Sequence, residues 1–191
     1  MPDPIPLLSY LSPMKFEISE AAAHKAKIPH EVFLTNLIGN HILWFVASLG
    51  VARSFWQPVA LVPVVSLITL FYTLWRARRS CQVDEWYVMC HWQLAAARSR
   101  VFLGMIMFAL LVCFAGWIGY TYFGMMEVAV YAVVGGGSIL PVMVTVLILI
   151  IMESDALHQT DQQKMPRSLL LKYPKPDGVV ALAEPENQPG T

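Results

Sequence analysis

Charged side chains are scarce in this sequence and missing altogether from four long stretches. Only 14% of its 191 residues are charged and 57% are hydrophobic, whereas an average soluble domain carries about 25% charged residues. The charge-free stretches cover residues 32–52, 58–75, 101–120 and 128–152. A soluble domain of this size could not bury four apolar runs of roughly 20 residues, which is the length that crosses a bilayer as a helix. The composition therefore excludes an ordinary soluble protein.

The sequence lacks the residue patterns that are typical of several functional classes. Three cysteines (Cys81, Cys90 and Cys113) provide no disulfide framework, and Cys81, Cys90 and His91 lack the short ligand spacing of a zinc site. The sequence has no phosphate-binding loop, no Gly-x-Ser-x-Gly elbow and no His-Glu-x-x-His motif. The formal net charge of zero gives no reason to expect nucleic-acid binding. We therefore expect no enzymatic activity, no metal site and no cofactor.

What is present predicts an all-α, polytopic integral membrane protein. Continuous spans must be helices, because lipid offers the backbone no hydrogen-bond partners. We expect three parts: an N-terminal segment (1–31), a domain of four transmembrane helices over the charge-free stretches (32–152), and a polar, Pro-rich tail (153–191), of which 174–191 reads as disordered. In the first part, Ser12 and Pro13 resemble the start of a short amphipathic surface helix. Pro29 should separate that helix from the first span.

Basic residues predict the orientation of the four spans. Twelve of the 13 Lys and Arg residues fall in segments that alternation of the spans places on one side of the membrane. Positively charged loops stay in the cytoplasm, so both termini should be cytoplasmic, and we expect a bacterial inner membrane. The sorted residues are Lys15, Lys25 and Lys27; Arg76, Arg78, Arg79, Arg98 and Arg100; Lys164, Arg167, Lys172 and Lys175; Arg53 alone lies on the other side.

The connection between the second and third spans predicts a cytoplasmic helical hairpin. It contains neither Gly nor Pro, and Val83, Trp86, Cys90 and Leu94 approximate one helical face. Both spans should therefore continue as helices beyond the membrane. Arg76, Arg78 and Arg79 are expected to contact anionic lipid headgroups and to orient the protein. This makes the lipid bilayer its first partner.

Polar residues inside the spans are the main site candidates. Asn36, Asn40 and His41 cluster in the first span, where hydrogen bonding to another helix is the expected use and a substrate or proton site is the alternative. His41 alone does not make a haem site, because His24, His30, His91 and His158 all lie outside the spans.

The fourth span contains the least ordinary local sequence of the chain. Three glycines remove side-chain bulk, and the proline removes a backbone donor. We expect a kink or a close packing point, within the bundle or against a partner, with a gating hinge as the alternative. The residues concerned are Gly135, Gly136, Gly137, Ser138 and Pro141.

These features favour a non-catalytic subunit of a larger membrane assembly, of the secretion, conjugation or respiratory type. Its partners would be other membrane subunits or further copies of the same chain. One alternative is a small oligomeric channel or transporter component, which would need a polar path across the bilayer. The second alternative is a haem- or metal-binding membrane protein, which would need paired ligands on facing helices.

Overall fold

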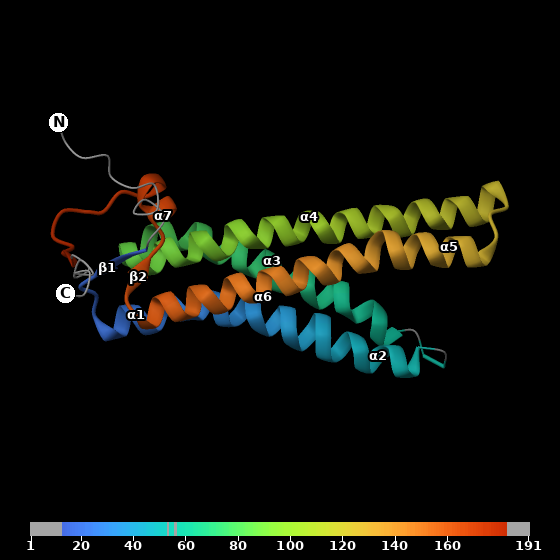
Figure 1. Ribbon diagram of the computed structural model, residues 1–191, viewed down its shortest axis with the longest axis horizontal. Helices are drawn as coiled ribbons and strands as arrows, with labels where there is room; N and C mark the ends of the chain where they lie inside the picture. The colour runs from blue at the N-terminus through green and yellow to red at the C-terminus, as the bar shows by residue number, and fades with distance from the viewer. Residues whose placement is uncertain (1–12, 53, 56, 183–191) are drawn as a thin grey trace, which may run out of the picture.

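Four long helices dominate the computed structural model, which describes residues 13–52, 54–55 and 57–182 (Figure 1). Each is long and apolar enough to cross a membrane: Glu20–Val51, Gln57–Val83, Trp86–Phe123 and Glu127–Asp161. Arg53 and Ser12 lie outside the described residues. We call the end of the bundle that holds both ends of the described chain the base, and the opposite end the tip.

The first helix is continuous where the sequence predicted an interruption. It comprises α1 (Glu20–Leu34), the π-helical η2 (Thr35–Trp44) and α2 (Phe45–Val51). Pro29 lies buried inside α1 without ending it. The helix also begins later than predicted, because the Ser19 hydroxyl caps it by accepting a hydrogen bond from the backbone N–H of Ala22 at 3.2 Å. The prediction of a separate amphipathic helix from Pro13 is therefore wrong.

The predicted helical hairpin between the second and third spans is present in the fold. Helix α3 (Gln57–Val83) and helix α4 (Trp86–Phe123) both continue toward the base and are joined by a turn at Asp84 and Glu85. The Arg76 guanidinium donates two hydrogen bonds to the Asp84 carboxylate, at 2.7 and 3.0 Å. This bidentate pair closes the hairpin, and it holds the pKa of Asp84 below its usual value of 3.8.

A small sheet and a short helix pack across the base. Strand β1 (Met14–Phe16) lies between β2 (Lys164–Met165) and β3 (Ala181–Leu182), antiparallel to both, with Lys15 opposite Lys164 and Leu182. Helix α7 (Arg167–Lys172) follows β2. The expectation of a wholly irregular segment over 174–191 does not hold at β3, because its backbone pairs with β1. That pairing joins residues from opposite ends of the chain.

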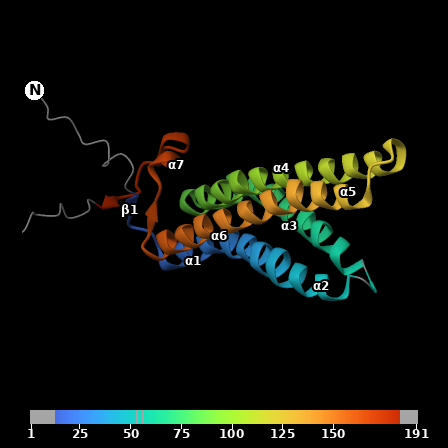
Figure 2. The ribbon, with the colours of Figure 1, turned by 45° about the vertical axis from the view of Figure 1, so that its right-hand side comes forward.

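The fourth helix runs from the tip to the base and comprises α5 (Glu127–Val134), the π-helical η3 (Gly135–Ile139) and α6 (Leu140–Asp161). Buried apolar side chains form two clusters. One lies at the base around Phe16, Tyr87 and Met165, and the other lies at mid-height around Phe33 and Phe102. Toward the tip the helices separate into an α4–α5 pair and an α2–α3 pair, as both views show (Figures 1 and 2). Helix α5 contains no buried residue.

Candidate functional site

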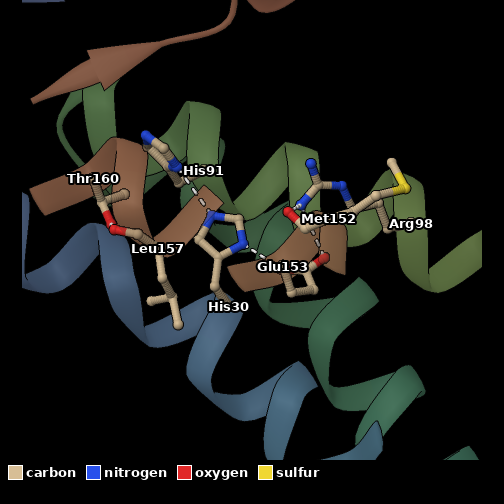
Figure 3. A network of polar contacts seen from close by, with 7 residues as sticks. All are labelled: His30, His91, Arg98, Met152, Glu153, Leu157 and Thr160. Carbon is tan, nitrogen blue, oxygen red and sulfur yellow. Dashed lines mark hydrogen bonds and ion pairs between the residues drawn. The ribbon is translucent and has the colours of Figure 1, made fainter. Parts of the chain in front are cut away.

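The most unusual group in the structure is a largely buried set of ionisable side chains near the base (Figure 3). Helix α1 contributes His30, helix α4 contributes His91 and Arg98, and helix α6 contributes Glu153. His30, His91 and Glu153 are each 0% exposed. We call these four residues the buried cluster.

The buried cluster is a linear chain of contacts. Oε2 of Glu153 lies 2.5 Å from Nδ1 of His30, and Nε2 of His30 lies 3.0 Å from Nδ1 of His91. At the other end, Nη1 of Arg98 lies 3.2 Å from Oε1 of Glu153 and donates a hydrogen bond to the Met152 carbonyl at 3.0 Å. Breaking such a buried pair leaves an uncompensated charge, which costs about 3–5 kcal/mol. The chain of contacts therefore holds α1, α4 and α6 to one another.

Sequence reasoning missed this cluster. His30 and His91 lie outside the predicted spans 32–52 and 101–120, and the sequence places Glu153 in the polar tail. The helices extend further toward the base than those stretches, so all three residues become interior. The one available signal was Glu153, an acid that directly follows 25 uncharged residues within the same helix.

The second polar group is the one that the sequence pointed to in the first span. Asn36 donates to the Ser66 hydroxyl at 3.1 Å, and Asn40 donates to the Val62 carbonyl at 2.8 Å and to the Asn36 amide oxygen at 3.2 Å. Nε2 of His41 lies 2.8 Å from the same Ser66 hydroxyl. The amides and the imidazole thus join η2 to α3.

A lateral groove of about 710 Å³ runs along the outside of this junction. Glu31, Thr35 and Gly39 follow one another along the first helix at intervals of four residues, and Thr69 faces them from α3. A Cβ atom at Gly39 would have only its own helix's Thr35 within reach, at 4.0 Å. The groove is therefore open along the bundle surface. It has a polar side, and a small residue lies in its floor.

The Gly135–Pro141 stretch adopts a π-helical turn, η3, just before the proline. A Cβ atom at Gly135 or Gly136 would meet nothing within 4 Å, and one at Gly137 would lie 3.6 Å from Val112. The close approach of two helices lies instead at Gly116 in α4, where a Cβ atom would lie 3.0 Å from Val134. Packing within the chain therefore uses Gly116 rather than Gly135 and Gly136.

The neighbouring Ser138 is buried and donates to the Val134 carbonyl at 2.5 Å. It lines a mainly apolar cavity of about 370 Å³ where the two helix pairs separate, together with His41 and Cys113. A transport path along this cavity would have these three residues as its polar lining.

The remaining candidates lie near the hairpin. Arg76 is occupied by Asp84 and its guanidinium lies 4.9 Å from the centre of the Trp92 ring, whereas Arg78 and Arg79 are exposed. Cys81 is exposed and Cys90 is buried. Over the described part of the chain, no group of three or more His, Cys, Asp or Glu residues is arranged to hold a metal ion. No known family model matches this chain, and no curated protein and no solved structure is similar to it.

Proposed function

We propose that this protein is a non-catalytic subunit of a membrane assembly and that it binds a transmembrane helix of a partner protein in the lateral groove. The single observation that carries the proposal is the groove itself, whose lining combines a carboxylate, hydroxyls, two amides and a glycine with apolar side chains. Small residues allow helix backbones to approach closely in a membrane, and polar side chains form hydrogen bonds between helices.

The surroundings of the groove support insertion into lipid. Large apolar side chains stand outward on every long helix, including Leu43, Ile68, Leu111 and Ile151, each more than 60% exposed. Water would solvate such a surface poorly, whereas lipid chains match it. In the proposed orientation the base faces the cytoplasm of a bacterial inner membrane. The reason is that the basic residues which the sequence assigns to the cytoplasmic side lie toward the base wherever the structure describes them.

The charge in the groove defines the partner. Glu31 is exposed at the end of the groove nearer the base and forms no ion pair with any residue that the structure describes. A Lys or Arg just inside the cytoplasmic end of a partner helix would complement this carboxylate, and such helices commonly carry basic residues there. From Glu31 to Trp44 the groove extends roughly 20 Å, about two thirds of the hydrocarbon thickness. An apolar helix with a small residue opposite Gly39 and a basic residue opposite Glu31 fits these dimensions.

The alternatives have less support from the geometry. A channel needs polar groups along its path, whereas the cavity between the helix pairs is mainly apolar. A haem needs histidine nitrogens that face a common space, whereas His30 and His91 contact each other and His41 contacts Ser66.

Site-directed photo-crosslinking in native membranes tests the groove. A photoreactive side chain at Gly39 should give one discrete protein adduct, whereas the same group at Leu111, on the lipid-facing side of α4, should give lipid adducts. Gly39→Leu should abolish co-purification of the protein captured in that adduct. The leucine would occupy the part of the groove that the partner helix needs, and this chain has room for the leucine itself. Gly104→Leu is the matched control, since a Cβ atom there meets nothing within 4 Å. It should leave the partner bound.

Charge reversal at the groove supplies a second readout. Glu31→Lys should weaken the same complex by repelling the basic residue of the partner helix. Retention of the partner by Gly39→Leu, or lipid adducts alone at both crosslinking positions, would overturn the proposal. An adduct of twice the mass of this chain would identify a second copy as the occupant, which contradicts the proposed partner protein. Ion flux through liposomes that contain only this chain would favour the channel instead.

A further inference from the structure

We propose that the buried cluster is a binding site for one proton, which is taken up at Nε2 of His91 and carried as charge by His30. The proposal is independent of the lateral groove. It starts from the one ring nitrogen in the cluster that stands outside the chain of hydrogen bonds: Nε2 of His91 is buried and has no hydrogen-bond partner among the described residues.

The protons in the chain can be counted from its geometry. The short contact between His30 and Glu153 requires a proton on Nδ1 of His30, because the carboxylate is also paired with Arg98 and acts as an acceptor. The contact between the two rings holds only one proton, which belongs either to Nδ1 of His91 or to Nε2 of His30. Two complete states of the cluster follow.

In the first state both histidines are neutral. His91 donates from Nδ1 to the bare Nε2 of His30, and its own Nε2 is a lone pair without a donor. The charges of Arg98 and Glu153 then cancel. This state satisfies both internal hydrogen bonds with no net charge in the interior.

The second state contains one more proton and keeps the same heavy-atom contacts. A proton binds to the lone pair at Nε2 of His91, and the N–H bond at its Nδ1 breaks. That proton forms a new bond to Nε2 of His30. His30 becomes an imidazolium that donates to Glu153 and to His91, while His91 is neutral again in its other tautomer. The added positive charge thus resides next to the Glu153 carboxylate, which stabilises it.

Among the charged groups around the buried cluster, Glu153 is the counter-ion of protonated His30. Arg98 is the other ionised group of the cluster, and the Tyr87 ring, whose centre lies 4.7 Å from that of the His91 ring at an interplanar angle of 56°, adds no charge. On the same helices Lys27 and Asp161 form a separate ion pair. On α3, which packs against α1 and α4, Arg76 is paired with Asp84, and Arg78 and Arg79 are exposed.

Nitrogen NMR of ¹⁵N-histidine-labelled full-length protein in phosphatidylethanolamine–phosphatidylglycerol vesicles tests this site. As the pH is lowered, His30 should change from one protonated ring nitrogen to two. His91 should change its protonated nitrogen from Nδ1 to Nε2 at the same midpoint. The coupled tautomer change is the diagnostic result, because an isolated histidine would simply gain a proton. Titration of His30 with no change at His91, or no titration of either ring, would overturn the proposal.

A matched variant separates proton transfer from hydrogen bonding. In His91→Asn the amide can still donate to Nε2 of neutral His30, but toward the imidazolium it offers only an amide oxygen, which is a weaker proton acceptor than an imidazole nitrogen. Half-protonation of His30 should therefore need at least a tenfold higher proton concentration. His24→Gln, at an exposed position on α1, should leave the midpoint unchanged. An unchanged midpoint in His91→Asn would contradict the proposal. Should that variant fail to fold, the tautomer change in the natural chain still decides the question.

Discussion

The base and the tip of this bundle are formed by the same four long helices, yet their side chains are buried very differently. At the base, α1, α3, α4 and α6 enclose aromatic rings and a buried ionic cluster, and a three-stranded sheet packs across their ends. At the tip the helices separate into two pairs, and α5 buries no residue at all (Figure 2). The base resembles the interior of a soluble protein, whereas the tip depends on its surroundings to cover its apolar faces.

The difference shows where specificity resides in this molecule. Apolar packing between lipid-facing helices gains little from the hydrophobic effect, since lipid is as apolar as the side chains. The base can exclude water from Tyr87 and Met165 and can also form polar contacts that only one arrangement satisfies. We therefore expect substitutions at the base to cost more stability than equivalent ones at the tip.

The largest effect should come from removing the charge of Glu153. Glu153→Gln leaves Arg98 as an uncompensated charge, and we expect a loss of about 3–5 kcal/mol. Glu127→Gln is the matched change at the tip, where the carboxylate is exposed and accepts a hydrogen bond from Tyr131. It should change stability by less than about 0.5 kcal/mol. Thermal unfolding of the detergent-solubilised variants measures both, and equal losses would remove the distinction between base and tip.

An intermediate effect is expected at the close contact between α4 and α5 near Gly116. Gly116→Leu would drive a side chain into Val134 and Val130, which lie 3.0 and 3.4 Å from the added Cβ atom. Overpacking of this kind costs about 1–3 kcal/mol. Gly136→Leu adds the same side chain in open space and should be neutral within about 0.5 kcal/mol.

The Gly116 and Gly136 variants are compared most directly by protease resistance of the purified protein. A destabilising Gly136→Leu together with a neutral Gly116→Leu would show that α5 and η3 pack against α4 differently from the structure described above.

The smallest effect should come from the Arg76–Asp84 pair at the base. Asp84→Asn removes a partly exposed bidentate ion pair and should cost about 0.5–1 kcal/mol. Because the pKa of Asp84 is lowered in the folded state, this stabilisation is present above the ordinary pKa of aspartate and is lost as the pH falls through the folded value. The difference in unfolding temperature between the natural chain and Asp84→Asn should therefore be constant near neutral pH and shrink below about pH 4. A difference that grows on acidification would contradict the assignment.

Much of the architecture was accessible from local patterns. The four charge-free stretches correspond to the four long helices, and the absence of Gly and Pro around Trp86 and Cys90 correctly predicted the helical hairpin. The starts and ends of helices were less predictable. Pro29 is compatible with helix once its ring packs in the interior, and whether it does so depends on the neighbouring helices rather than on the residues beside it.

The candidate sites likewise contain some residues that the sequence identifies and others that it does not. Asn36, Asn40 and His41 stand out as polar residues within an apolar run, so their place on one helix is visible in the sequence. Ser66, the shared partner of Asn36 and His41, is not visible in this way, because a lone serine in a span usually needs no partner from another helix. The lateral groove depends equally on Thr69, whose place in its lining follows from the way in which the first helix packs on α3.

By itself, the sequence determined which segments are apolar helices and how the basic charges are distributed among them. Both follow from sums over neighbouring residues. Only the tertiary structure brought together His30 and Glu153, 123 residues apart, and His30 and His91, 61 residues apart. The physical reason is that such contacts depend on the length and rotation of whole helices. Hydropathy and helical periodicity specify which face of a helix is apolar, but not which side chain from another helix will oppose a given position.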